Sequence, residues 1–154
     1  MAGWTLPMEG ACRCGQVRFR VNKAPLFTAV CHCTGCQKMT GGAYSTTMAV
    51  PADGFDVIEG ETVIGGEQQD PRLLHHHCDH CKSWMFTRIE PGMGFVNVRA
   101  TMLDDPRWFT PFVESYTSEA LPWATIDAPH SYEKFPPMEE YQALLAEFAE
   151  INAS

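Results

Sequence analysis

The chain has 154 residues, 45% of them hydrophobic, which is enough apolar material for an ordinary core and predicts a single domain over residues 1–154. No stretch approaches the roughly 18 consecutive apolar residues that a membrane helix requires, so we expect no membrane partner. The formal net charge is −8, and the 11 basic residues form no run. Because sequence-independent nucleic-acid binding needs clustered Lys and Arg, we also expect no nucleic-acid partner.

The N-terminal residues Met1–Pro7 lack the basic region and the long apolar region of a secretory signal. We therefore expect a cytoplasmic protein, in a reducing compartment where cysteines stay as thiols or metal thiolates. The count of seven cysteines points the same way, because a disulfide framework would leave one thiol unpaired.

Most of the chain reads as short strands separated by turns. Val17, Phe19 and Val21 alternate with polar residues, which is the period-two pattern of a half-buried strand. The other patterns predict strands at 27–30, 43–50, 83–89 and 93–101, a small hairpin formed by 57–58 and 62–64, and an exposed loop at 65–70.

The C-terminal part predicts one helix. Pro136-Pro137 precedes a segment whose apolar residues recur at helical spacing. Residues 108–130 are rich in aromatic side chains and Pro and predict irregular structure, in which 112–116 could pair as a strand. The fold class predicted is mainly β (α+β), with a C-terminal helix. The apolar positions of that helix are Met138, Tyr141, Leu144, Leu145, Phe148 and Ile151.

The cysteines carry the strongest functional signal. They fall into the groups Cys12-Arg-Cys14, Cys31-His-Cys33-Thr-Gly-Cys36 and Cys78-Asp-His-Cys81. Two thiolates one or two residues apart can both reach one ion, and Zn²⁺ suits thiolates in a reducing cell. Four ligands close a zinc site and three leave a position open, so seven cysteines predict two zinc ions per chain, one closed and one open.

The pairing of the groups follows from their sizes. Cys31, Cys33 and Cys36 can place three sulfurs on one ion, which leaves the other two pairs to form a structural site from Cys12, Cys14, Cys78 and Cys81. A competing arrangement joins Cys31 and Cys33 to the pair at 78 and 81 and gives Cys36 no role. One structural zinc with buried, inert cysteines is a further alternative.

The histidines are weaker candidates for metal ligands. His32 could close the second site, although its side chain should point away from an ion held by both neighbours. His75, His76 and His77 read as strand residues on alternating faces, and His80 as a solvated residue.

Several motifs resemble those of the family of the glutathione-dependent formaldehyde-activating enzyme and centromere protein V. Two departures stand out: Lys82 occupies a position where the family commonly has Gly, and the chain is shorter than the enzyme that names the family. The motifs that carry the resemblance are Glu9-Gly10-Ala11-Cys12-Arg13-Cys14-Gly15, the run Cys31–Cys36 with Lys38 and Gly41-Gly42, Cys78–Cys81, Leu103-Asp104-Asp105-Pro106, and Ser118–Trp123.

The resemblance implies an Mss4-like fold of several coiled, mostly antiparallel sheets, a four-cysteine structural zinc and a three-cysteine zinc as the catalytic candidate. It also implies a carbon–sulfur lyase-like activity that forms or cleaves a thiol–aldehyde adduct such as S-hydroxymethylglutathione. Glutathione or a similar small thiol and an aldehyde would then be the partners, and the protein a monomer or homodimer.

Glutathione carries two carboxylates, so an acidic protein must supply local positive charge to bind it. Lys38, near the open site, and Arg99 are candidates, and Trp123 or Tyr44 could line a pocket. The main alternative is a non-enzymatic zinc module of Mss4-like type that binds a protein partner. A methionine-sulfoxide reductase would need a cysteine beyond the metal ligands, and none is spare if both zinc sites exist.

Overall fold

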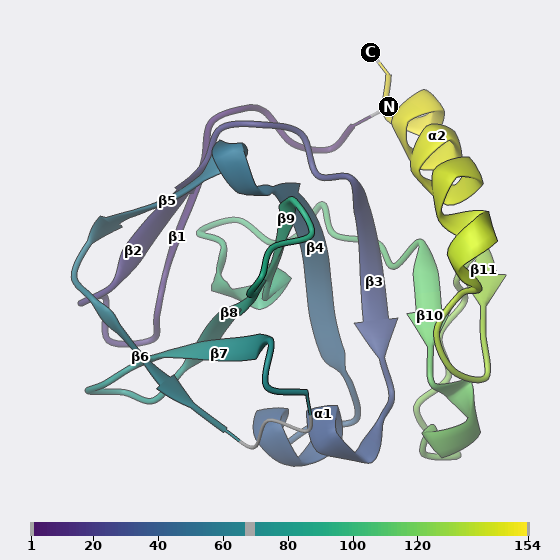
Figure 1. Cartoon of the computed structure of the whole chain (residues 1–154), viewed down its shortest axis with the longest axis horizontal. Helices are drawn as coiled ribbons and strands as arrows, with labels where there is room; N and C mark the ends of the chain where they lie inside the picture. Colours follow the sequence, from purple (N-terminus) through teal and green to yellow (C-terminus); the bar gives the residue numbers. More distant parts are fainter. Residues whose placement is uncertain (1, 67–69, 154) are drawn as a thin grey trace.

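The computed structural model describes residues 2–66 and 70–153. Within them the chain forms a three-stranded sheet in the order β1-β2-β5 and an eight-stranded sheet in the order β11-β10-β3-β4-β9-β8-β7-β6 (Figure 1). Pairing is antiparallel except where β10 lies parallel to both β3 and β11. The mainly β class with a C-terminal helix is therefore confirmed, with two sheets carrying the strands.

The larger sheet contains β3 (Phe27–Cys31), β4 (Ser45–Pro51), β6 (Thr62–Gly65), β7 (Leu73–Cys78), β8 (Trp84–Ile89), β9 (Phe95–Val98), β10 (Val113–Ser115) and β11 (His130–Ser131). The smaller sheet contains β1 (Met8–Ala11), β2 (Arg18–Val21) and β5 (Phe55–Glu59). The helices are α1 (Thr34–Thr40) and α2 (Tyr141–Ile151), with short 3₁₀ turns at Ala52–Gly54, Ala100–Met102, Thr117–Glu119 and Met138–Glu140.

The alternating pattern of β2 is explained by burial. Phe19 and Val21 are fully buried, whereas Arg18 and Arg20 stay half-buried on the other face and bind Glu9. The apolar face packs into the main core, where the Phe19 and Phe55 rings lie 5.5 Å apart. The predicted strand at 17–21 is thus confirmed.

The hairpin expected at 57–58 and 62–64 is wrong. β5 pairs with β2 in the smaller sheet, and β6 pairs with β7 in the larger one. Gly60 lies between them at φ +74°, a left-handed conformation, and a Cβ there would lie against the carbonyl of Gln16. Local alternation predicts two strands but does not say which sheet each one joins. Of the exposed loop expected at 65–70, Gly65 ends β6 and residues 67–69 lie outside the described part of the chain.

The C-terminal helix α2 lies at the edge of the larger sheet, beside β10 and β11 (Figure 1), and also contacts β3. Leu144 and Phe148 are buried with Phe112 in a second apolar cluster, and the Trp4 ring stacks 6.2 Å from that of Phe148. The predicted apolar face extends too far, because Met138 and Ile151 are 73% and 50% exposed. Neither α1 nor α2 combines the length and hydropathy needed to cross a bilayer, and no other helix in the described part of the chain does so.

Two of the sequence motifs meet in space. Gly10 bridges to Leu103, and the Asp104 N–H donates to the carbonyl of Glu9 at 2.9 Å. Arg18 joins the same contact through an Nη2–Oδ2 hydrogen bond of 2.8 Å to Asp104. The turn that follows Ala100–Met102 is therefore fixed against the strand that leads to Cys12.

Candidate functional site

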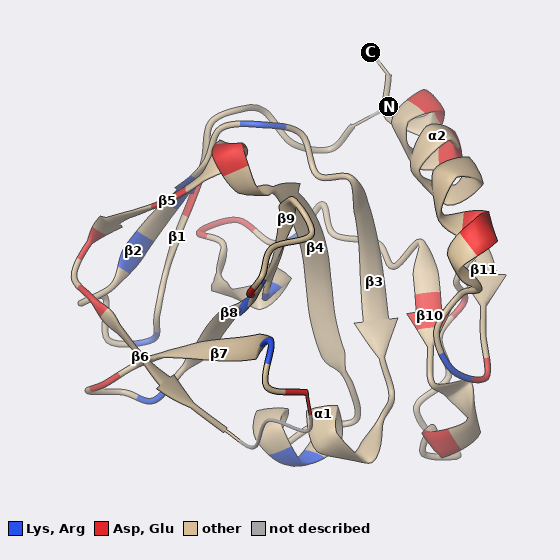
Figure 2. Ribbon diagram, viewed as in Figure 1, with Lys and Arg blue, Asp and Glu red and all other residues tan. Residues whose placement is uncertain are grey.

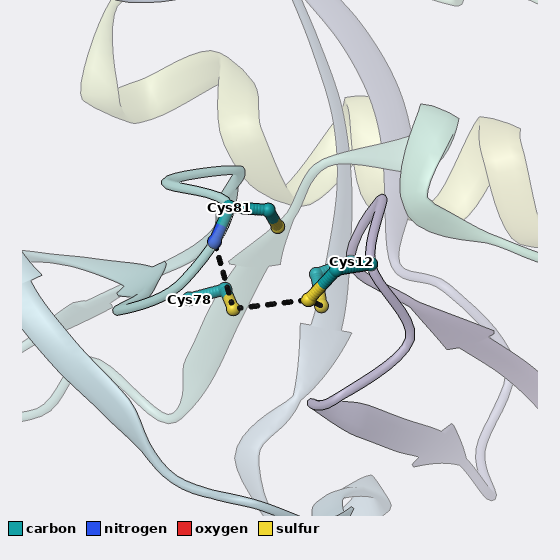
Figure 3. Close-up of side chains that lie close together, drawn as sticks. Cys12, Cys78 and Cys81 are labelled. Atoms are coloured by element: carbon teal, nitrogen blue, oxygen red, sulfur yellow. Dashed lines mark hydrogen bonds between the residues drawn. The ribbon is translucent and has the colours of Figure 1, made fainter.

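The four-cysteine cluster joins the two sheets. Cys12 and Cys14 lie in the turn after β1, Cys78 ends β7, and Cys81 lies in the turn before β8. Their sulfurs all lie within 4.8 Å of one another, and the labelled side chains converge in Figure 3. The Sγ–Sγ distances are 3.6 Å from Cys12 to Cys14 and 3.7 Å from Cys14 to Cys78.

These distances fit one tetrahedral ion. The edge of a tetrahedron with Zn–S bonds of 2.3 Å is about 3.8 Å, far longer than the roughly 2.05 Å of a disulfide. Backbone N–H groups of Val17 and Cys81 also point at the sulfurs of Cys12 and Cys78, at 3.4 and 3.5 Å. Such donors favour thiolates, so the donor set suits a thiophilic metal.

The turn at this cluster places Lys82 in a backbone conformation that favours glycine. Lys82 has φ +63°, the left-handed region that a side chain disfavours and glycine adopts freely. Its N–H donates to the carbonyl of Cys78 at 2.9 Å, which closes the turn. A glycine after the last cysteine therefore meets a backbone requirement, and Lys82 meets it with strain.

The second cluster contains three cysteines. Cys31 ends β3, Cys33 caps α1 and Cys36 lies in its first turn, and the three sulfurs lie within 4.8 Å of one another. No other His, Cys, Asp or Glu of the described residues joins this group. All three side chains are half-buried. The set therefore offers three thiol ligands to a metal ion, one fewer than a closed tetrahedral site contains.

The charge of this cluster is concentrated on one sulfur. Hydrogen bonds from Cys31 and Cys36 lower the pKa of Cys33 to about 2, and the bond to Cys33 raises the pKa of Cys31 above its usual range. The Cys36 N–H also donates to Cys33 Sγ at 3.3 Å. Cys33 is thus the most acidic of three thiols in mutual contact, and a bound metal ion would favour the thiolate form of all three.

Helix α1 is the element that sequence reasoning missed. It starts inside the cysteine run, with Cys33 as its N-cap, and ends at Gly41 with φ +67°. Gly41 is the left-handed C-cap that ends the helix. The signal that could have found this helix was Cys33-x-x-Cys36 followed by a glycine pair, although seven residues are too few for apolar periodicity.

Buried hydrogen bonds connect the three-cysteine loop to the neighbouring strand β10. The side chain of His32 is completely buried and points to Glu114, with Nε2 to Oε2 at 3.0 Å. The His32 N–H donates to the carbonyl of Ser115, and Gln37 Nε2 donates to the His32 carbonyl at 2.7 Å. The expectation that His32 points away from the metal position agrees with this hydrogen bond, because its ring is engaged by β10.

A pocket of about 350 Å³ lies between helix α1 and the turn that follows Cys81. Met39 and Thr40 of α1 line one side, Thr46 of β4 another, and Ser83 and Trp84 connect it to the four-cysteine turn. None of the three cysteines lines the pocket, but two of its lining elements lead to them: helix α1 carries Cys36, and the charge of Arg99 interacts with those of Cys36 and Cys31.

The predicted substrate residues occupy very different places. Arg99 is 6% exposed and lines the pocket, as does Tyr44. Lys38 is exposed on α1, two residues from Cys36 and hence on a different face of that helix. Trp123 is 73% exposed. Neither Lys38 nor Trp123 lines this pocket, so their assignment to substrate stays a prediction.

The remaining histidines do not join either cysteine cluster. His75 is buried and its Nδ1 lies 2.9 Å from Thr87 Oγ1, whereas His76 stacks on Phe86 with ring centroids 4.5 Å apart. Both belong to β7, as the sequence predicts, and His80 is exposed in the turn.

A mostly antiparallel β scaffold with one four-thiol and one three-thiol cluster defines a protein with two candidate metal centres. The family profile described as Glutathione-dependent formaldehyde-activating enzyme matches residues 7–119, and the chain belongs to this family. A Halomonas elongata protein that carries the same family name is 32% identical over 108 residues, which are 65% of this chain and 69% of that protein.

The fold has a solved counterpart. A crystal structure of a Rhodobacter sphaeroides protein superposes with a TM-score of 0.53, covering 65% of this chain and 93% of the other. At 18% identity this likeness concerns the fold alone. The family identified from the cysteine and Leu-Asp-Asp-Pro motifs is confirmed by the profile match.

Proposed function

We propose that this chain is a zinc-dependent, carbon–sulfur lyase-like enzyme that forms or cleaves a thiol–aldehyde adduct such as S-hydroxymethylglutathione. The observation that carries the proposal is the three-thiol cluster of Cys31, Cys33 and Cys36, which lacks a fourth protein ligand in the described chain and interacts with Arg99, a residue that lines a pocket. Family membership supports the substrate class, glutathione and formaldehyde.

Each cysteine cluster has its own role in this proposal. Cys12, Cys14, Cys78 and Cys81 would hold a structural zinc, because they connect the start of the chain to the turn between β7 and β8. Cys31, Cys33 and Cys36 would hold a second zinc, which when bound accepts a further ligand and lowers the pKa of a thiol.

The reaction itself is a simple addition. The thiol sulfur forms a bond to the aldehyde carbon, the carbonyl π bond breaks, and the proton lost by the thiol ends on the new hydroxyl oxygen. The reverse reaction breaks the carbon–sulfur bond and returns that proton to sulfur. Because no oxidant or reductant is needed, the main contribution of the protein is to orient the two reactants.

The pocket supports this orienting role. Met39 and Trp84 supply apolar lining, and Tyr44 and Thr46 are lining residues that carry hydroxyl groups. In this proposal the pocket would orient a small thiol for the addition.

Exchange spectroscopy by NMR tests the proposal. With ¹³C-formaldehyde and glutathione at equilibrium, zinc-loaded protein should speed exchange between hydrated formaldehyde and S-hydroxymethylglutathione, and the Cys36→Ser variant should not. An exchange rate equal to that of buffer would refute the proposed reaction and leave the alternative of a non-enzymatic zinc module.

A further inference from the structure

Arg99 is a buried cation that pairs with no Asp or Glu among the described residues. It follows β9 at the start of the 3₁₀ turn Ala100–Met102, and its backbone is fixed by an N–H to Met85 carbonyl bond of 2.9 Å. The residue is 6% exposed, and its Nε is buried without a hydrogen-bond partner. Within residues 2–66 and 70–153, no ion pair with Asp or Glu involves Arg99.

The guanidinium is held in place by an aromatic ring. Its central carbon lies 4.2 Å from the centroid of Trp84, a cation–π distance, and Trp84 is itself anchored by an Nε1–Oγ1 hydrogen bond of 3.1 Å to Thr87. Burial lowers the pKa of Arg99 to about 10, while the charges of Cys36 and Cys31 oppose that shift. The side chain therefore stays cationic at neutral pH.

The pocket that Arg99 lines is lined by cations and no carboxylate, in a protein that is acidic as a whole. Its described lining includes the cations Arg99 and Lys82 and no carboxylate, although the whole chain carries 19 acidic residues against 11 basic ones. The Lys and Arg segments are otherwise scattered over the ribbon (Figure 2). Lys82 is partly neutralised by Asp79 at 2.8 Å, so Arg99 supplies the unpaired charge.

We propose that Arg99 forms a carboxylate subsite in this pocket and binds a carboxylate of the small thiol substrate. The identity of the thiol rests on the proposed function, whereas the binding of an anion by Arg99 does not. A guanidinium has a planar fork of donors that matches a carboxylate, and a buried unpaired cation gains most from such a partner. Arg99 would thereby select thiols that carry a carboxylate over those that do not.

Calorimetric binding to the zinc-loaded protein tests this selection. Glutathione is compared with 2-mercaptoethanol, a thiol without a carboxylate, on the wild type and on Arg99→Gln. The variant should bind glutathione about ten- to a hundredfold more weakly, because a charge-assisted hydrogen bond is lost. Its affinity for 2-mercaptoethanol should not change.

Arg88→Gln is the matched control. Arg88 also lies over an aromatic ring, 5.4 Å from the Phe86 centroid, but it does not line the pocket. This variant should bind both thiols as the wild type does. If Arg99→Gln fails to fold, Arg99→Lys keeps the charge without the fork, and it should weaken glutathione binding while sparing 2-mercaptoethanol.

A second comparison of two ligands uses the wild-type protein alone. Glutathione dimethyl ester, in which both carboxylates are neutralised, should bind the wild type at least tenfold more weakly than glutathione. Equal affinities for the ester and the acid would overturn the subsite. The subsite would also be overturned if Arg99→Gln lost affinity equally for glutathione and for 2-mercaptoethanol. That result would make Arg99 a counterion of the cysteine thiolates. Carboxylate discrimination without faster adduct exchange would leave the subsite standing and remove the proposed reaction.

Discussion

His32 and Glu114, 82 residues apart in the chain, form a buried hydrogen bond of 3.0 Å between Nε2 and Oε2. Their side chains are 0% and 11% exposed. Because a carboxylate only accepts, the Nε2 hydrogen of His32 is donated to Glu114, whose other oxygen accepts from Ser131 Oγ at 2.9 Å. The loop that carries Cys31 and Cys33 is thus fastened to β10 and β11 through one imidazole.

Removing this bond should loosen the three-cysteine loop. We expect His32→Asn and Glu114→Gln each to lower the free energy of unfolding by about 2–4 kcal/mol, since a buried polar partner is left unpaired. The double variant should show a coupling energy of about 1–3 kcal/mol. Urea unfolding measures the free energies, and a competition titration should show zinc affinity at this cluster falling about 10- to 100-fold.

The pair His130–Glu147 supplies the control. Its Nε2–Oε2 distance is 2.9 Å, but the side chains are 28% and 46% exposed. The corresponding single and double variants of His130 and Glu147 should give a coupling energy of less than about 1 kcal/mol, because water screens exposed charges. Equal coupling in the two pairs would contradict the positioning role given to His32.

Lys82 offers a test of backbone strain at the four-cysteine turn. Lys82 has φ +63°, a conformation that only glycine adopts freely. The metal-loaded Lys82→Gly variant should therefore be more stable than Lys82→Ala by about 1 kcal/mol. The alanine variant is the matched control, because it also removes the exposed contact to Asp79. Urea midpoints measure the difference, and an alanine variant as stable as the glycine variant would show that the turn is unstrained.

His75 should make stability depend on pH. Burial lowers the pKa of His75 below the ordinary value of 6.5, so the unfolded chain takes up the proton first as the pH falls. The stability contributed by neutral His75 is complete above pH 6.5 and is lost as the pH falls from there toward the folded pKa.

His75→Asn isolates this effect. Unfolding free energies measured across the same pH range should fall less steeply for this variant than for the wild type. His80→Asn removes an exposed histidine from the neighbouring turn and should follow the wild-type profile. Parallel profiles for wild type and His75→Asn would contradict the assignment.

Short-range spacing predicted much of this molecule. Cysteines one or two residues apart must lie together, and the alternation around Phe19 must bury one face, so both features follow from the sequence. The sheet that β6 joins depends on pairing with β7, which no local pattern encodes. The burial of Arg99 depends on Trp84, 15 residues earlier in the chain, and helix α1 depends on a thiol cap that propensity does not describe.

The central claim is that the two cysteine clusters bind zinc independently, one for the fold and one for chemistry. Metal analysis of protein purified without chelator should give about two zinc ions per chain, and about one for Cys36→Ser with the circular dichroism spectrum retained. Cys78→Ser should instead lose the folded state, because four ligands join the two sheets. One zinc ion in the wild type, or loss of both ions and of the fold in Cys36→Ser, would contradict the claim.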